Sequence, residues 1–220
     1  MHTNQKLPLT FALATLMMCG SASAAITVYT SEASFRSAIS APATDTFNDL
    51  TVGTFIPGPA SRSAGPYNYT VTTAANALLF VAGSSADPWL STEDATDSIV
   101  FLRFNGGVRA AGAFFFGSNF QGMFTSADVR VTATDAGGTV SRALPGATTR
   151  TFLGFISTGA LTGLEVDVMQ PLDTFVYPTV NDLTLAMAAE SVRVVPLPGT
   201  LALMAPALLL TGLVARRRRR

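Results

Sequence analysis

The segment DVRVTATDAGGTVSRAL, residues 128–144, constrains the fold more than any other part of the chain. Apolar and polar side chains alternate along its first half, and the apolar set is Val129, Val131 and Ala133. Such a period of two is typical of a strand with one buried face and one solvated face. Residues 135–138 have turn-forming composition, and the chain then returns through residues 139–143. The segment therefore predicts an antiparallel hairpin.

Other segments of this chain also have strand-like patterns. Strands are predicted at 26–29, 43–50, 161–169 and 178–187, and a hairpin is predicted around Asn105-Gly106 within residues 98–117. The run Phe114–Phe116 is predicted to be a strand buried on both faces. Ser31 can cap a short helix over residues 32–40, in which Phe35 and Ile39 recur at helical spacing.

These elements predict an all-β fold, an antiparallel β-sandwich or jelly roll with one short N-terminal helix. The sandwich is predicted as a single domain over residues 25–193, a length sufficient for one sizeable core. A C-terminal transmembrane helix is predicted in addition.

The first 24 residues have the composition of a secretory signal peptide. Lys6 precedes an apolar stretch over residues 7–20, and Ala22-Ser23-Ala24 supplies the small residues of a cleavage site before Ala25. Lipoprotein processing at Cys19 is the alternative, and the bulky Met18 disfavours it. We therefore expect the protein to be exported after processing by signal peptidase.

Export would remove the single His, Lys and Cys of the chain, which are His2, Lys6 and Cys19. The mature chain would then lack the residues of His-dependent nucleophilic sites, of His/Cys zinc sites and of disulfides. Residues 25–195 contain eight arginines and all fourteen acidic residues, a net charge of −6. Because phosphate binding needs a clustered basic face, we expect no nucleic-acid partner.

The C-terminal segment begins with an uncharged run over residues 194–215 and ends in five arginines, Arg216, Arg217, Arg218, Arg219 and Arg220. A helix of that length would be roughly 33 Å long, about the thickness of a bilayer core. The arginines are expected to stay in the cytoplasm as an anchor. A buried amphipathic helix is the alternative, but the run has no polar face.

The combination of Val195-Pro196-Leu197-Pro198, an apolar helix and an arginine cluster resembles the PEP-CTERM sorting signal. Leu197 stands where that motif usually has Glu, so residues 194–220 are similar to its Val-Pro-Leu-Pro variant. The resemblance implies an exosortase-type processing enzyme as a partner. It also implies a membrane anchor before processing, and then a place at the cell surface or in the extracellular exopolysaccharide matrix.

The domain also resembles the galactose-binding or carbohydrate-binding jelly rolls often found with this tail, through Thr46-Phe47-Asn48-Asp49 and Asn181-Asp182. In such modules a structural Ca²⁺ often lies between the first and last strands. The resemblance thus implies a calcium site at Asp45, Asp49 and Asp182. The alternative is that these are ordinary turn and edge-strand acids.

Two features bear on ligand chemistry. The only tryptophan, Trp89, is a candidate for stacking on a sugar face, and the alternative is a ring that plugs the end of the core. The acidic residues of segment 84–98 are candidates for a Ca²⁺ site or a glycosidase pair, and the alternative is a solvated loop. They are Asp87, Glu93, Asp94 and Asp97.

The sequence therefore predicts an exported, non-enzymatic β-sandwich at the cell surface or in the matrix, one that binds glycans or exopolysaccharide. The alternatives are a carboxylate-dependent glycan hydrolase and a purely structural surface protein.

Overall fold

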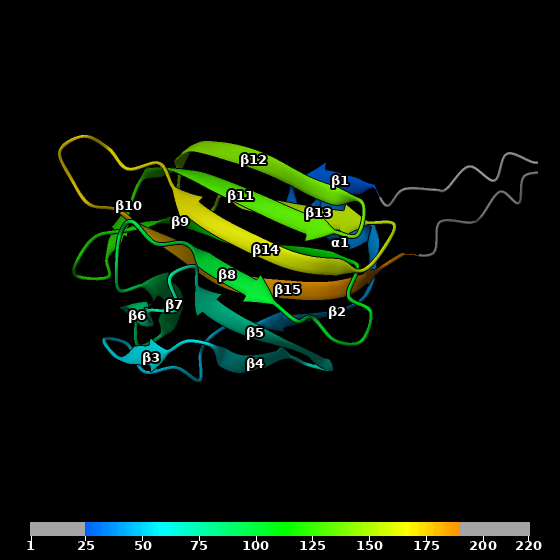
Figure 1. The fold of residues 1–220 in the computed structure, drawn as a ribbon, viewed down its shortest axis with the longest axis horizontal. Coiled ribbons are helices and arrows are strands. Elements are labelled where there is room, and N and C mark those ends of the chain that lie inside the picture. The colour runs from blue at the N-terminus through cyan, green and yellow to red at the C-terminus, as the bar shows by residue number, and fades with distance from the viewer. Residues whose placement is uncertain (1–24, 190–220) are drawn as a thin grey trace, which may run out of the picture.

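The structure is a computed structural model that describes residues 25–189. These residues form a β-sandwich (Figure 1). Its elements in chain order are β1 (Ile26–Tyr29), α1 (Glu32–Ser37), β2 (Ile39–Asp45), β3 (Phe55–Pro57), β4 (Ala60–Ala64), β5 (Tyr67–Thr73), β6 (Leu78–Ser84), β7 (Asp87–Thr92), β8 (Ile99–Leu102), β9 (Ala110–Ser118), β10 (Phe124–Thr125), β11 (Ala127–Asp135), β12 (Gly138–Ala147), β13 (Phe152–Ser157), β14 (Leu161–Val168) and β15 (Tyr177–Ala188).

Two antiparallel sheets make up the sandwich. Sheet A has nine strands in the order β1-β13-β9-β15-β7-β6-β3, with β10 paired to β9 and β2 paired to β15. Sheet B has six strands in the order β12-β11-β14-β8-β5-β4. The predicted all-β, antiparallel sandwich is confirmed.

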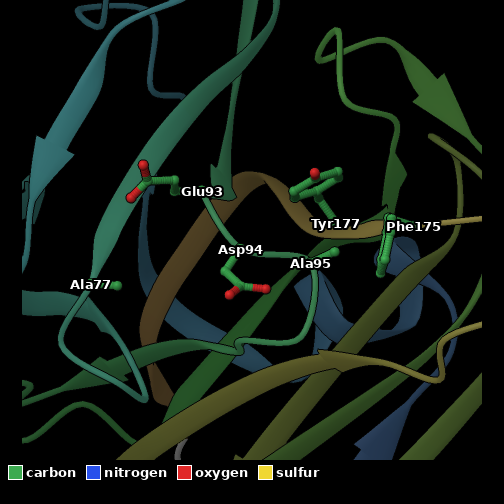
Figure 2. A pocket seen from close by; sticks show the side chains of 6 residues that line it. All are labelled: Ala77, Glu93, Asp94, Ala95, Phe175 and Tyr177. Atoms are coloured by element: carbon green, nitrogen blue, oxygen red, sulfur yellow. The ribbon is translucent and has the colours of Figure 1, made fainter.

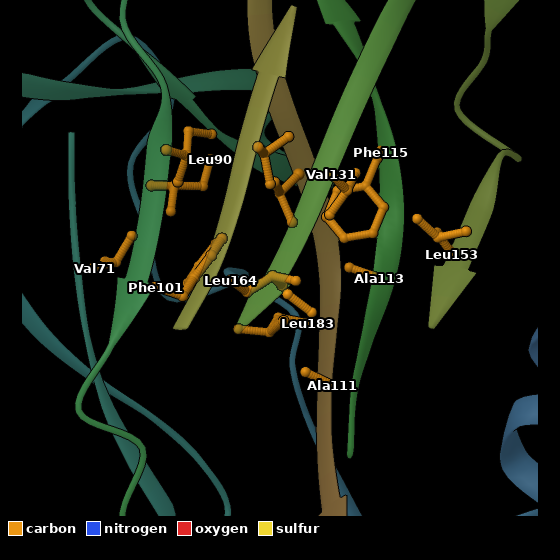
Figure 3. Packing of buried hydrophobic residues seen from close by; sticks show 14 of the residues in the cluster. Val71, Leu90, Phe101, Ala111, Ala113, Phe115, Val131, Leu153, Leu164 and Leu183 are labelled. Atoms are coloured by element: carbon orange, nitrogen blue, oxygen red, sulfur yellow. The ribbon is translucent and has the colours of Figure 1, made fainter. Parts of the chain in front are cut away.

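The core lies between the facing sides of the two sheets (Figure 3). Val129, Val131 and Ala133 of β11 are fully buried there, while Arg130 between them is exposed. On the opposing sheet, Phe115 of β9 is fully buried in the same cluster. Burial of a side chain of this kind contributes about 1.5–3 kcal/mol, so these alternating positions fix which face of each strand points inward.

The predicted hairpin over residues 128–144 is confirmed as β11 and β12, whose register runs from Asp135 opposite Gly138 to Ala127 opposite Ala147. The carboxylate of Asp135 accepts hydrogen bonds from the backbone N–H groups of Gly137 and Gly138 at 2.7 and 3.1 Å. The side chain of Asp135 thus stabilises the turn by hydrogen bonds to the turn's own backbone. The strands predicted at 26–29, 161–169 and 178–187 are also present, as β1, β14 and β15.

The hairpin predicted around Asn105-Gly106 is wrong. The strand before this turn, β8, pairs with β5 and β14 in sheet B, whereas the strand after it, β9, pairs with β13 and β15 in sheet A. Both edges of each strand are therefore occupied by other partners. The turn connects the two sheets instead of two neighbours in one sheet.

The helix α1 begins where the sequence predicts, because the hydroxyl of Ser31 accepts a hydrogen bond from the backbone N–H of Ser34. It ends at Ser37 instead of Ser40, since Ile39 already pairs with Ala188 of β15. Phe35 is fully buried on the outer face of sheet A, the face turned away from sheet B. A Cβ atom added to Gly154 would lie 2.5 Å from the Phe35 ring, so the glycine allows the helix to pack this closely.

The two ends of the described chain lie at the same end of the sandwich. Residue 25 pairs with Thr158, and Ala189 donates a backbone hydrogen bond to Ala38. The loops β9–β10 and β14–β15 lie at the opposite end, which we call the loop end (Figure 1). No helix within residues 25–189 has the length and apolarity that a membrane span requires. The predicted span at 194–215 lies outside the described residues, as do the signal peptide, the motif at 195–198 and the arginines at 216–220.

Candidate functional site

A partly buried ion-pair cluster, which we call the Arg62 cluster, joins the buried Asp45 and Tyr69 to Arg62 and the exposed Asp49. Arg62 donates from Nε and Nη2 to the two oxygens of Asp45, both at 2.8 Å, and from Nη2 to Asp49 Oδ1 at 2.7 Å. The Tyr69 hydroxyl donates to Asp45 Oδ2 at 2.6 Å. The guanidinium also lies over the ring of Phe47, 5.2 Å from its centroid. Such bidentate, charge-assisted bonds are among the stronger ones in proteins.

Ionisation in the Arg62 cluster follows from these contacts. Burial by itself would lower the pKa of Arg62, but the hydrogen bonds to Asp45 and Asp49 outweigh burial and raise it. Burial raises the pKa of Tyr69, and the neighbouring charge of Asp45 raises it further. The hydrogen bond from Arg62 lowers the pKa of Asp49. The guanidinium therefore stays charged and the phenol stays neutral.

A local turn builds this cluster. The predicted strand over residues 43–50 is wrong in its second half, because β2 ends at Asp45 and Phe47 has a left-handed φ of 58°. The backbone N–H of Phe47 donates to Asp45 Oδ1 at 2.9 Å, which stabilises the turn. The turn brings Asp49 back to the same guanidinium that Asp45 binds.

The structure does not assemble the calcium site implied for Asp45, Asp49 and Asp182. A guanidinium, rather than a metal ion, neutralises the first two carboxylates. Strand β2 does lie beside β15, as the prediction required, with Asp45 opposite Leu183. Asp182, however, is not among the partners of Arg62. Within residues 25–189, no three His, Cys, Asp or Glu side chains are grouped so that they could hold a metal ion.

Unlike Asp45 and Asp49, Asp182 has no partner in the Arg62 cluster. It lies at an irregularity where the register of β15 shifts against β9. Its φ is 54°, a left-handed value. Burial is the largest cause that raises the pKa of Asp182, and the carboxylates of Asp87 and Glu32 raise it further. The charge of Arg36 lowers it. The carboxyl of Asp182 thus faces α1 and β7 and is harder to ionise than an ordinary aspartate.

Trp89 lies on the outer face of sheet A, since its neighbour Leu90 points into the core. The indole is half-buried and packs edge-on against Phe116, with ring centroids 4.9 Å apart. It also covers Gly83, where an added Cβ would lie 3.0 Å from the indole. Its Nε1 donates to Asp87 Oδ2 at 3.0 Å. Trp89 therefore lies between the two expectations, neither a freely exposed platform nor a core plug.

The acidic segment around Trp89 is dispersed. Asp87 accepts from the side-chain amide of Asn181 at 3.0 Å on the outer face of sheet A. Asp97 is buried and accepts from the backbone N–H groups of Ala75 and Ser98. In the β7–β8 loop Glu93 and Asp94 are exposed, whereas Asp97 of the same loop is buried, so the four acids form neither a calcium loop nor one catalytic group.

Glu93 and Asp94 line a depression of about 430 Å³, which we call the loop-end depression. Its lining residues are Ala77, Glu93, Asp94, Ala95, Phe175 and Tyr177. Figure 2 shows the rings of Phe175 and Tyr177 on one side and the two carboxylates on the other. The Phe175 side chain is 72% exposed, and Tyr177 is half-buried at the start of β15. Aromatic rings and carboxylates therefore face the same open space.

Hydrogen bonds hold the walls of the loop-end depression in place. Asp94 accepts from the backbone N–H and the hydroxyl of Thr96, both at 2.8 Å, and these bonds lower its pKa. Gln170 Nε2 donates to the carbonyls of Ala95 at 2.5 Å and Val176 at 2.7 Å. Gln170 thus connects the β14–β15 loop that carries Phe175 to the β7–β8 loop that carries the acids.

Sequence reasoning missed Phe175 and Tyr177. The available signal was an aromatic residue in the otherwise loop-like stretch QPLDTF, residues 170–175. Exposed large apolar side chains are concentrated in the loops of this end, including Phe120 at 79% and Leu172 at 102% exposure. Exposed apolar groups of this kind often mark ligand or partner sites.

Comparison with known proteins adds little to this description. No protein-family model matches the chain, and no curated protein matches it. Among solved structures, the chain has a distant likeness to the CBM51-2 and INT domains of Clostridium perfringens ZmpB, with 10% identity and a TM-score of 0.36. The match covers 69% of this chain and 33% of that chain. A likeness this distant carries no argument about the present site.

Proposed function

We propose that this protein is an exported, non-enzymatic glycan-binding β-sandwich that acts at the cell surface or in the exopolysaccharide matrix. The observation that carries the proposal is the loop-end depression, which is lined by the exposed ring of Phe175, the ring of Tyr177 and the side chains of Glu93 and Asp94. The rings would stack on the apolar face of a sugar, and the carboxylates would accept hydrogen bonds from its hydroxyl groups.

The position of the loop-end depression supports this proposal. The β14–β15 loop, which carries the lining residue Phe175, is at the end of the sandwich opposite residues 25 and 189 (Figure 1). If the C-terminal segment tethers the protein as its motif predicts, the depression points away from the membrane. A polymer in the surrounding matrix would then reach it without obstruction.

Retention on polysaccharide affinity gels tests the binding proposal. We expect Phe175→Ala to reduce retention of the mature protein by about fivefold to tenfold, because about 1–1.5 kcal/mol of stacking is lost. Phe55→Ala is a matched control, since Phe55 is a half-exposed aromatic residue on β3 that does not line the depression. Equal retention of wild type and Phe175→Ala on every gel that binds the protein would refute the site.

Trp89→Ala distinguishes the two aromatic surfaces. If the loop-end depression is the binding site, this variant loses stability through its contacts with Phe116 and Gly83 but keeps its retention. If retention falls while the variant remains folded, Trp89 is the sugar-binding platform, and the site belongs on the outer face of sheet A.

A glycan hydrolase is the second candidate function. It is favoured by Asp182, whose pKa is raised by burial and then by the charge of Asp87, because glycoside hydrolysis uses one carboxyl that is harder to ionise together with a second carboxylate. Release of reducing ends from the retained polysaccharide would support this candidate, provided that Asp182→Asn abolishes the release. Retention without release supports the non-enzymatic proposal.

The sorting part of the proposal rests on residues 1–24 and 194–220, outside the described structure. Intact mass and fractionation of the protein from its native cells test it. A mature protein without residues 1–24 and without the segment after Pro198 would support processing by signal peptidase and an exosortase-type enzyme. A full-length tail in the inner membrane, or normal localisation after neutral replacement of Arg216–Arg220, would contradict it.

A further inference from the structure

We infer that the loop-end depression selects glycans that carry protonated amino groups and rejects polyanionic ones. This inference rests on the proposed function and names the ligand class of the same site. It follows from which charges and rings line the depression, and from which charges do not.

Every charge among the lining residues is negative. Glu93 and Asp94 are both exposed, and no arginine is among the six residues that line the depression. Asp173 adds a further exposed carboxylate in the β14–β15 loop beside Phe175. Like charges brought to within a few ångströms repel one another, so uronate or sulfate groups would enter at a cost.

None of the seven arginines of residues 25–189 lines the loop-end depression, and three of them pair with carboxylates elsewhere. Arg36 pairs with Glu32, Arg62 belongs to the Arg62 cluster, and Arg130 pairs with Asp167 on the outer face of sheet B. The charges that line the loop-end depression are therefore those of its own carboxylates.

The aromatic rings favour the same ligand as the carboxylates. A cation is attracted to the face of a Phe or Tyr ring, and here Phe175 and Tyr177 lie across from the carboxylates (Figure 2). An ammonium group on a sugar would satisfy both kinds of wall at once. An uncharged sugar would use only stacking and hydroxyl hydrogen bonds, and would bind more weakly.

The orientation of one carboxylate is already fixed. Asp94 is held by the backbone N–H and the hydroxyl of Thr96, so no side-chain rotation is needed to present its charge. Asp94→Asn would retain an oxygen acceptor for both bonds and remove only the charge. The substitution Asp94→Asn therefore tests the contribution of the Asp94 charge to binding without a change in the shape of the loop.

Isothermal titration of the mature protein with three hexasaccharides tests the inference. The probes are a glucosamine hexamer, its fully N-acetylated counterpart and a galacturonate hexamer, at about pH 5.5, where the carboxylates and the sugar amines are charged. We expect the glucosamine hexamer to bind about tenfold more tightly than the acetylated one, and the galacturonate hexamer not to bind. Added salt of about 0.5 M should reduce the preference.

The variant Glu93→Gln/Asp94→Asn should lose the preference for the amine, because both hexamers then meet uncharged acceptors in the depression. Asp167→Asn is the matched control, because it removes one carboxylate from the other sheet. Equal or tighter binding of the acetylated or galacturonate hexamer overturns the charge inference but leaves glycan binding standing. A preference for the amine that survives in the double variant also overturns the charge inference. Absence of binding to all three probes and to the polysaccharide gels overturns both the charge inference and the proposed function.

Discussion

The Arg62 cluster and the loop-end depression contain similar side chains in opposite environments. Each combines two carboxylates with aromatic rings. In the Arg62 cluster the carboxylates of Asp45 and Asp49 bind a guanidinium, and Tyr69 is 2% exposed. In the loop-end depression the carboxylates and the ring of Phe175 face open space.

The difference shows what distinguishes a structural cluster from a site available to a ligand. Residues whose polar atoms are already paired within the chain stabilise the fold and have little left to offer a ligand. Residues that stay exposed although they are apolar or charged contribute little to stability. Loss of stability should therefore follow changes in the Arg62 cluster, and loss of binding should follow changes in the loop-end depression.

The largest effect is expected for Arg62→Met. The change leaves Asp45, which is 5% exposed, without its cation, and removal of one partner from a buried pair costs about 3–5 kcal/mol. Urea denaturation measures this change in the free energy of unfolding. Arg130→Met breaks an exposed ion pair with Asp167 and should cost less than about 1 kcal/mol. If Arg62→Met and Arg130→Met lowered the free energy of unfolding equally, the Arg62 cluster would contribute no more to stability than the exposed pair of Arg130 and Asp167.

A smaller loss is expected for Tyr69→Phe, about 1–2 kcal/mol, because a buried hydrogen bond to a charged acceptor disappears. Tyr67→Phe serves for comparison, since the Tyr67 hydroxyl donates at 2.8 Å to the neutral carbonyl of Ala41. Thermal unfolding of both variants should show the larger decrease in Tm for Tyr69→Phe. The reverse order would contradict the importance of the Asp45 charge.

Asp182→Asn should stabilise the protein slightly at neutral pH, because it removes a half-buried carboxylate that is disfavoured by burial and by the charges of Asp87 and Glu32. The folded-state pKa of Asp182 lies above its ordinary value of 3.8, so the folded state binds the proton more tightly than the unfolded state. The free energy of unfolding of the wild type therefore falls as the pH rises from the unfolded-state pKa of about 3.8 through the higher folded-state pKa. Asn also tolerates the left-handed φ of 54°.

Urea titrations of both proteins across a pH series check this expectation. The advantage of Asp182→Asn should vanish near about pH 3, where the aspartate is protonated in both states. An advantage of equal size at every pH would mean that charge is not its cause.

The smallest effect on stability is expected for Phe175→Ala, within about 0.5 kcal/mol, since the side chain is 72% exposed. The matched comparison is Phe115→Ala in the core, which should cost about 3–5 kcal/mol. Both are measured by urea denaturation. A large loss for Phe175→Ala would place this ring among the structural residues and weaken its assignment to a binding surface.

Local patterns predicted part of the fold well. The alternation in residues 128–144 gave the correct hairpin, because a strand with one buried face must repeat every two residues. Ser31 marked the start of α1, because its hydroxyl satisfies a backbone donor of the first turn. The connection at Asn105-Gly106 was misassigned, since a turn signal does not reveal which strands its neighbours will pair with.

The candidate sites were harder to predict. The adjacency of β2 and β15 was expected and is present, yet Asp45 and Asp182 do not converge, because Asp45 lies opposite the core residue Leu183 and not opposite Asp182. The loop-end depression combines residues near positions 77, 94 and 176, from three separate loops and strand ends. No spacing in the sequence connects these positions.

Sequence patterns alone were sufficient to predict the all-β class and the inward face of the strands with the clearest alternation. The sequence also determined the charge balance and the loss of His, Lys and Cys that export would bring. These properties are local or additive, so periodicity and composition carry them. Strand pairing in three dimensions was needed to show that Arg62 neutralises Asp45 and Asp49, that Trp89 is half-buried, and that Phe175 lines one depression with Glu93 and Asp94. These outcomes depend on strand pairing across long separations in the chain, which local propensity does not specify.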